Sequence, residues 1–154
     1  MNEYVTPAAP LRALVEELLR GGVREAVICP GSRSTPMALA LRAAPELRTW
    51  VHLDERAGAF FALGAARATG RPVAVLATSG TAVINFAPAA FEARYGRVPL
   101  ILLTADRPPE LQGIGSPQTI DQVELYGRGV KWFAELPVPD DSPDSEIEVR
   151  STVG

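Results

Sequence analysis

The sequence predicts an α/β domain: a doubly wound parallel sheet with helices on both faces. Short apolar segments alternate with longer segments of helical periodicity along most of the chain. The apolar segments are hydrophobic on both faces, as strands buried between two layers of helices are. A length of 154 residues, with 47% hydrophobic and 21% charged residues, suits one globular domain with a proper core.

The first part of the chain reads as helix, strand, helix and strand. Thr6 and the proline after it match an N-cap followed by proline at the first helical position, and Gly21 supplies a C-terminal stop. Between them, leucine and valine recur at the spacing of one apolar helix face. Residues 25–29 then form a buried-strand pattern, 35–44 a second helix opened by Thr-Pro, and 50–53 a second strand.

A central helix is expected directly after this strand, over residues 55–69, with a stop near Gly70. Asp54 is well placed as its N-cap, and Glu55 lies in the first turn, where the helix dipole favours negative charge. The helix is rich in alanine and glycine and has little polar surface, so we expect it to pack against a second subunit as well as its own sheet. A carboxyl group beside so dry a helix suits proton transfer. The alternative is that Glu55 only complements the dipole.

The rest of the chain continues the alternation and then changes in composition. The expected elements are a strand at 72–77, a helix at 81–95, a strand at 98–103, a short helix at 118–126 and an edge strand at 131–135. From residue 137 onward proline, aspartate, serine and glutamate dominate, which is typical of a linker or surface segment. Residues 146–153 could be the first turns of another helix.

Polar groups follow four of the predicted strands. They are Pro30-Gly31-Ser32-Arg33, Asp54-Glu55, Thr78-Ser79-Gly80-Thr81 and Asp106-Arg107. Because ligands of open α/β sheets bind beyond the carboxyl ends of the strands, we expect all four groups along one edge, at a ligand site.

Each group has a plainer alternative when taken singly. The loop from Pro30 could bind an anion through its backbone amides, or be an ordinary strand–helix turn, and it is neither a P-loop nor Gly-x-Gly-x-x-Gly. Arg33 and Arg107 together could fork onto the carboxylates of a small acid, whereas each alone would be a solvated surface arginine. The hydroxyl groups of Thr78 and Thr81 could line a site or cap a helix.

Several classes of function find no support. A net charge of −3 gives no electrostatic case for binding nucleic acid or acidic membranes. The N-terminus lacks a signal-peptide pattern and the apolar runs are far shorter than a membrane span. One cysteine, Cys29, excludes an internal disulfide and fits a reducing cytoplasm. No metal-ligand cluster or Ser/His/Asp triad is visible. Cys29 and His52 are interpreted as structural residues. The aromatic residues Trp50, Trp132 and Phe133 are interpreted as packing residues.

Four segments together resemble one family. Residues 29–36, 53–56, 77–82 and 103–111 are similar to the N-terminal, pyrimidine-binding domain of the 2-succinyl-5-enolpyruvyl-6-hydroxy-3-cyclohexene-1-carboxylate (SEPHCHC) synthases, which are thiamine diphosphate enzymes of menaquinone biosynthesis. Each segment is weak alone, but four in order at these separations are specific. The resemblance covers the chain from Thr6 to Pro139.

The resemblance implies roles for the residues of the predicted edge. Glu55 would hydrogen-bond the aminopyrimidine ring of thiamine diphosphate and promote the tautomer that activates the cofactor. The family decarboxylates 2-oxoglutarate and adds the succinyl unit to isochorismate, and both substrates are carboxylic acids. Residues implied to contact substrate are Ser32, Arg33, Arg107 and Gln118. Residues implied to line the aminopyrimidine pocket are Pro30, Gly31, Thr78 and Thr81.

Two departures from the family pattern matter. Pro117 stands where the family often has asparagine before Gln118, so the backbone has no amide donor there. The family's separate domain, which binds diphosphate and Mg²⁺, has no counterpart in the sequence. Since family sites form between subunits, we expect a homodimer or higher homo-oligomer and an isolated chain that is inactive. The expected division is a pyrimidine-binding domain at 1–139 and an acidic Pro/Ser-rich segment at 140–154, truncated before the rest of the enzyme.

Two other functions stay open on the sequence alone. The chain could be the same domain of another thiamine diphosphate decarboxylase or synthase, such as an acetolactate-synthase-like enzyme, although the two arginine segments argue against this. It could also be a non-catalytic binding or regulatory subunit that kept the fold, although a pure scaffold has no need of a carboxylate at Glu55.

Overall fold

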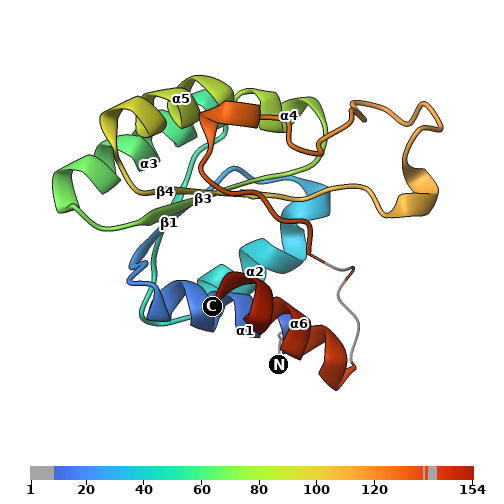
Figure 1. Ribbon diagram of the computed structural model, residues 1–154, viewed down its shortest axis with the longest axis horizontal. Helices are drawn as coiled ribbons and strands as arrows, with labels where there is room; N and C mark the ends of the chain where they lie inside the picture. Colours follow the sequence, from blue (N-terminus) through green and yellow to red (C-terminus); the bar gives the residue numbers. More distant parts are fainter. Residues whose placement is uncertain (1–8, 137, 139–141) are drawn as a thin grey trace.

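The computed structural model describes residues 9–136, 138 and 142–154, and it is a parallel sheet between two layers of helices (Figure 1). The described part contains a sheet of four strands: β1 (Glu25–Ile28), β2 (Arg48–Val51), β3 (Val73–Ala77) and β4 (Leu100–Thr104). All neighbours are parallel and the order is β2-β1-β3-β4. The predicted fold class is therefore confirmed. The expected N-cap at Thr6 lies outside the described residues.

The strand order reverses between β1 and β3. From β1 the chain moves outward to β2, crosses back over β1 to β3, and then continues to β4. β3 is buried along its whole length, while β2 and β4 form the edges. The crevice at such a reversal is where open α/β sheets place their ligands.

One face of the sheet is covered by α1 (Ala9–Arg20), α2 (Thr35–Ala43) and α6 (Pro143–Val153) (Figure 1). Apolar side chains of these helices pack with one set of strand residues in a single cluster that includes Leu14, Leu41 and Val149. Arg150 of α6 also forms ion pairs with Glu16 and Glu17 of α1, at 2.6 and 2.8 Å. Residues 143–153 thus form a helix, as anticipated for 146–153, and this helix packs against the sheet domain.

The other face is covered by α3 (Glu55–Thr69), α4 (Thr81–Ile84) and α5 (Ala87–Gly96). The Asp54 side chain accepts a hydrogen bond of 2.7 Å from the Ala57 amide, which confirms the predicted N-cap. Gly70 ends α3 in the left-handed conformation, with φ of 66°. Small buried residues such as Ala62 let α3 lie close to the strands, because no long side chain separates the two backbones.

The outer side of α3 is apolar and exposed in the single chain. Phe60 and Phe61 are 41% and 36% exposed, and Leu53, just before the helix, is 86% exposed.

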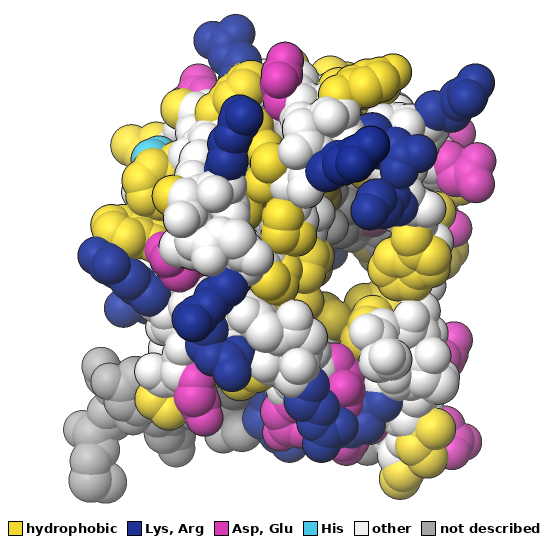
Figure 2. Space-filling model, turned by 60° about the vertical axis from the view of Figure 1, so that its left-hand side comes forward, with side chains coloured by type: hydrophobic (Ala, Val, Ile, Leu, Met, Phe, Trp, Pro, Cys, Tyr) yellow, Lys and Arg dark blue, Asp and Glu magenta, His cyan; other side chains and the backbone are white. Residues whose placement is uncertain are grey.

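Figure 2 shows the side of the molecule away from the carboxyl edge, where basic, acidic and hydrophobic side chains are intermixed. No helix in the described residues is long and apolar enough to cross a membrane.

Three predicted elements differ in kind from the structure, and the strand expected at 50–53 lies two residues earlier, at Arg48–Val51. The helix expected at 81–95 is divided into α4 and α5, because Pro88 has no amide to donate to the carbonyl of Ile84. The helix expected at 118–126 is wrong: this segment consists of turns and extended residues, and Gln118 and Glu124 have φ of 55° and 49°. The strand expected at 131–135 is also wrong, and Trp132 is 62% exposed rather than packed.

Candidate functional site

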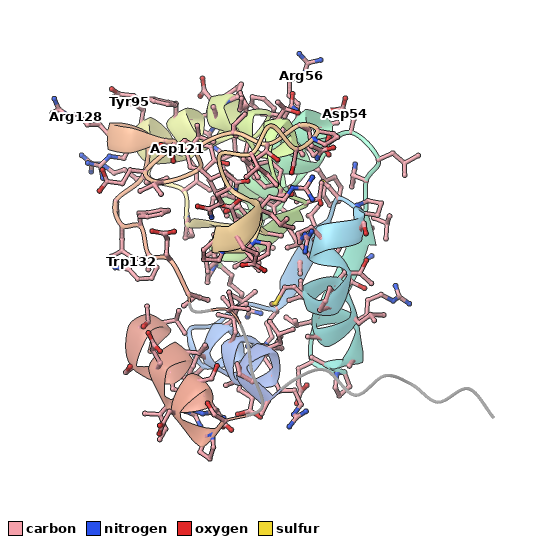
Figure 3. The ribbon with its side chains drawn as sticks, turned by 90° about the vertical axis from the view of Figure 1, so that its right-hand side faces the viewer. Asp54, Arg56, Tyr95, Asp121, Arg128 and Trp132 are labelled. Carbon is pink, nitrogen blue, oxygen red and sulfur yellow. The ribbon has the colours of Figure 1, made fainter. Side chains whose placement is uncertain are left out.

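The four predicted polar groups lie at one edge of the sheet, as the parallel strands require. This edge is on the right in Figure 1 and faces the viewer in Figure 3, where Asp54 marks the side of β2 and Asp121 belongs to the loop that follows β4. Across the edge the groups come in the order Asp54-Glu55, Pro30–Arg33, Thr78–Thr81 and Asp106-Arg107, because the strands are ordered β2-β1-β3-β4.

A cleft of about 220 Å³ opens at this edge. It lies where the strand order reverses, between the loops that follow β1 and β3, and the loop after β4 closes its far side. It is lined by Gly31, Ser32, Arg33, Thr78, Ser79, Arg107 and Gln118. Six of the predicted site residues therefore share one cleft. A second hollow, of about 290 Å³, lies at the opposite edge and contains none of them.

Gly31 allows the loops after β1 and β3 to meet. A Cβ atom at Gly31 would lie 2.4 Å from the Cβ of Thr78, closer than real side chains approach. The carbonyl of Gly31 accepts hydrogen bonds from the Ser34 amide and hydroxyl and from the Thr35 hydroxyl, at 3.1 to 3.2 Å. The loop is therefore a tight, well-bonded turn that carries Ser32 and Arg33 to the cleft.

The two arginines of the cleft differ in their bonding. Within the described residues, the Arg33 side chain makes no hydrogen bond or ion pair, so its guanidinium can receive an anion. Arg107 donates from Nε to the Thr119 hydroxyl at 3.2 Å and from Nη2 to the Pro117 carbonyl at 3.0 Å. Pro117 lacks an amide donor, but its carbonyl anchors Arg107. Arg107 thus lines the cleft and also stabilises its own loop through these two hydrogen bonds.

Gln118 is held by the turn that follows β3. Its side-chain amide donates to the Ser79 carbonyl at 2.7 Å, and its main-chain carbonyl accepts from the Thr81 amide at 2.9 Å. One of the two Nε2 hydrogens is therefore used within the protein, and the second hydrogen and the side-chain oxygen are what Gln118 can offer to a ligand. Thr81 adjoins the cleft through this backbone bond.

Glu55 stands apart from the cleft, at the end of β2 and on the other side of the β1 loop. Its side chain is half-buried and has no hydrogen-bond partner among the described residues. Asp54 beside it is committed to capping α3. Of the two neighbouring carboxylates, Asp54 uses Oδ1 for the cap, whereas both oxygens of Glu55 are without a hydrogen-bond partner among the described residues.

The first turn of α3 rests directly on the end of β1. A Cβ atom at Gly58 would lie 2.7 Å from the Cys29 sulfur and 3.2 Å from the Cβ of His52. Burial, and then the negative charges of Glu55 and Asp54, raise the pKa of Cys29 to about 12. Cys29 is 1% exposed and remains a neutral thiol at physiological pH, which confirms its structural reading. His52 packs on the Phe61 ring, with ring centres 4.7 Å apart.

Gln122 is the buried polar residue that sequence reasoning missed. It is 9% exposed and bonds the Gly80 amide and the Ala105 carbonyl, which lie 42 and 17 residues away in the chain. No local pattern marks such a residue, since its partners are distant in sequence. Within the described residues, no group of three or more histidine, cysteine, aspartate or glutamate side chains could hold a metal ion.

Comparison with known proteins adds a family. The family model of the thiamine pyrophosphate enzyme, N-terminal TPP binding domain, matches residues 11–125. A protein of Chloroflexus aurantiacus named 2-succinyl-5-enolpyruvyl-6-hydroxy-3-cyclohexene-1-carboxylate synthase is 61% identical over 128 residues, which is 83% of this chain and 22% of that protein. Proteins of the same name from Geobacillus kaustophilus and Myxococcus xanthus are 58% and 53% identical, over 86% and 92% of this chain. The chain spans less than a quarter of the length of these relatives, 22% to 24%.

Proposed function

Because the chain belongs to the thiamine pyrophosphate enzymes, as their N-terminal TPP-binding domain, we propose that it supplies the pyrimidine-binding half of a SEPHCHC synthase site. The proposed reaction is the decarboxylation of 2-oxoglutarate and the addition of the succinyl unit to isochorismate, in menaquinone biosynthesis. One observation carries the proposal: six predicted residues, two of them arginines, gather in a cleft at the strand-order reversal, with Glu55 on the neighbouring loop.

The carboxyl edge fits the aminopyrimidine ring of thiamine pyrophosphate, also called thiamine diphosphate. Glu55 offers a half-buried carboxyl group with no hydrogen-bond partner among the described residues, and in the neighbouring loop Gly31 lies so close to Thr78 that a side chain at position 31 would not fit. When bound, the cofactor supplies the electron sink that decarboxylation of a 2-oxo acid requires. Glu55 would hold a proton between its carboxyl oxygen and a pyrimidine ring nitrogen, with Pro30, Gly31, Thr78 and Thr81 around the ring.

The cleft residues suit acidic substrates. Arg33 brings an unpaired guanidinium, and Arg107 brings a second one whose position is fixed by Pro117 and Thr119. A guanidinium recognises a carboxylate through paired hydrogen bonds, so two on one rim favour a small molecule that carries carboxylates. The Ser32 hydroxyl and the remaining Nε2 hydrogen of Gln118 would complete the contacts to such a substrate.

The chain supplies only part of the site. Its cleft of about 220 Å³ falls below the roughly 300–1,000 Å³ of complete small-molecule pockets. We therefore place the diphosphate and Mg²⁺ in the part of the relatives that this chain does not span. The exposed Phe60 and Phe61 on α3 support association into a homodimer or higher homo-oligomer. In this division the pyrimidine-binding domain is proposed for 1–139, and in the 140–154 segment α6 packs back onto that domain through Val149 and Arg150.

The decisive experiment measures turnover of 2-oxoglutarate with isochorismate by the whole protein that carries this domain. Glu55→Gln should lower turnover by at least about a hundredfold, because the amide cannot exchange a proton with the pyrimidine ring. Asp54→Asn is the matched control, since asparagine still caps α3, and it should leave turnover within about threefold of wild type.

Near-normal turnover of the Glu55→Gln variant would overturn the role of Glu55. If the wild type turned over pyruvate in preference to 2-oxoglutarate, the domain would instead be assigned to an acetolactate-synthase-like enzyme. A calorimetric titration of the 154-residue chain with thiamine diphosphate and Mg²⁺ should show no binding; tight binding would mean that the chain forms a complete cofactor site.

A further inference from the structure

Gln122 joins the two loops of the carboxyl edge that follow β3 and β4. Its side-chain oxygen accepts a hydrogen bond of 2.6 Å from the Gly80 amide, and its side-chain nitrogen donates one of 3.0 Å to the Ala105 carbonyl. The side chain is buried, and both of its polar atoms are satisfied. It does not line the cleft, so any effect on a ligand has to pass through the residues it holds.

The turn that Gln122 holds has little freedom. Gly80 has φ of 80° and ψ of −141°, a conformation that is essentially restricted to glycine. A Cβ atom there would lie 1.9 Å from the Gln118 carbonyl oxygen. The same oxygen accepts from the Thr81 amide, and Gln118 donates back to the Ser79 carbonyl. The segment 118–122 therefore holds the Ser79-Gly80 turn through hydrogen bonds of both Gln118 and Gln122.

The hydrogen bonds of Gln122 connect residues next to two sides of the cleft. Thr78 and Ser79 line one side of it, immediately before Gly80, and Arg107 lines the other side, two residues after Ala105. Gln122 is the side chain that bonds both stretches of backbone at once. The Ala105 amide also bonds the Ala77 carbonyl, at 3.2 Å, so Gln122 adds two hydrogen bonds beyond the end of the strand ladder, at the point where the loops after β3 and β4 diverge.

We propose that Gln122 is a positioning residue of the carboxyl-edge cleft: it holds the Ser79-Gly80 turn at a fixed distance from the Arg107 loop, so that the cleft presents its polar groups in one arrangement to an acidic ligand. The identity of that ligand rests on the proposed function, whereas the positioning of the turn does not.

The first test measures hydrogen exchange of the Gly80 amide by NMR in the 154-residue chain. Gln122→Met keeps the length of the side chain but removes both polar atoms, and it should speed Gly80 exchange by about tenfold, the loss expected for one buried hydrogen bond. The Cys29 amide, bonded to the Leu76 carbonyl in the sheet, reports global unfolding, and Gly80 should accelerate well beyond any change at Cys29, because Gly80 itself loses its acceptor. Gln122→Glu keeps an acceptor for Gly80 and should restore much of its protection.

The matched control is Gln112→Met. Gln112 lies in the same loop, is exposed, and donates one hydrogen bond to the Arg107 carbonyl, so it should leave Gly80 exchange unchanged. Equal acceleration of Gly80 and Cys29 in the Gln122→Met variant would show general destabilisation and would overturn the proposal. Unchanged Gly80 exchange in that variant would overturn it as well.

The second test uses the whole protein and the proposed substrates. A misplaced cleft weakens ground-state and transition-state contacts alike, so Gln122→Met should raise KM for one of the two acids by about tenfold with kcat within about twofold. A fall in kcat with both KM values unchanged would mean a reduced folded fraction and would contradict positioning. If the wild type turns over neither acid, the proposed function fails, while the exchange result still decides the role of Gln122.

Discussion

Glu55 and Gln118 belong to the same edge of the sheet, but their positions are secured in opposite ways. Glu55 is placed by its immediate neighbours: Asp54 caps the helix, and Gly58 seats its first turn on the end of β1. Gln118 is placed by residues far away in the chain, through bonds to Ser79 and Thr81. The first arrangement is local and self-contained, and the second exists only when the loops after β3 and β4 have come together.

This difference separates the two halves of the proposed site energetically. A change in the loop over residues 105–126 should disturb the acid-binding cleft and leave the Glu55 side as it is. A change in the cap of α3 should do the reverse. The two sides meet at the loop after β1, where Gly31 lies against Thr78. Each of the following changes tests whether the sides are as independent as their bonding indicates.

The largest effect is expected for Gly80→Ala. The added Cβ would collide with the Gln118 carbonyl, and alanine is strained at φ of 80°. We expect a loss of about 3 kcal/mol in the free energy of unfolding, measured by urea denaturation of the chain. Gly64→Ala is the control: nothing lies within 4 Å of its Cβ, and it should stabilise α3 by about 0.5–1 kcal/mol. A Gly80→Ala variant as stable as wild type would show that the segment 118–122 yields easily.

A smaller effect is expected for Asp54→Ala, on the other side. Removing the cap leaves the Ala57 amide without its acceptor and should cost about 1 kcal/mol in the free energy of unfolding. Asp54→Asn should cost only a few tenths of that amount, since its oxygen still accepts. If Asp54→Ala also accelerated exchange of the Gly80 amide beyond this global loss, the two sides would be coupled and the comparison would be wrong.

The smallest effect is the pH dependence due to Cys29. Its pKa is raised from 9.0 to about 12, so the folded chain keeps its thiol proton after the unfolded chain has lost it. The contribution of the Cys29 thiol to the free energy of unfolding is therefore fully present below pH 9 and is lost as the pH rises toward 12. Between pH 8 and 9.5 the loss should be less than about 1 kcal/mol. Cys29→Ala should remove it, as thermal or urea unfolding at both pH values would show; an unchanged loss in that variant would assign it to other groups.

Local sequence determined the elements of the fold. The strands near 25–29, 72–77 and 98–103 were predicted from apolar runs, and α3 was predicted with its cap, because hydrophobic periodicity and capping act between residues close in the chain. The parallel pairing of the strands then brought the predicted polar groups to one edge, and the reversal of strand order between β1 and β3 placed the cleft there. Six of the predicted residues share the cleft for this reason, while the chemical roles given to them depend on the family resemblance.

Tertiary structure alone decided the segment after β4. Its residues suggested a helix at 118–126, but the backbone there turns through positive φ at Gln118 to bond a turn 39 residues earlier. Gln122 escaped notice for the same reason, since one of its partners lies 42 residues away. A buried amide that satisfies distant backbone groups leaves no periodic trace in the sequence. The local pattern therefore determines where the site lies, and long-range hydrogen bonds determine the shape of its cleft.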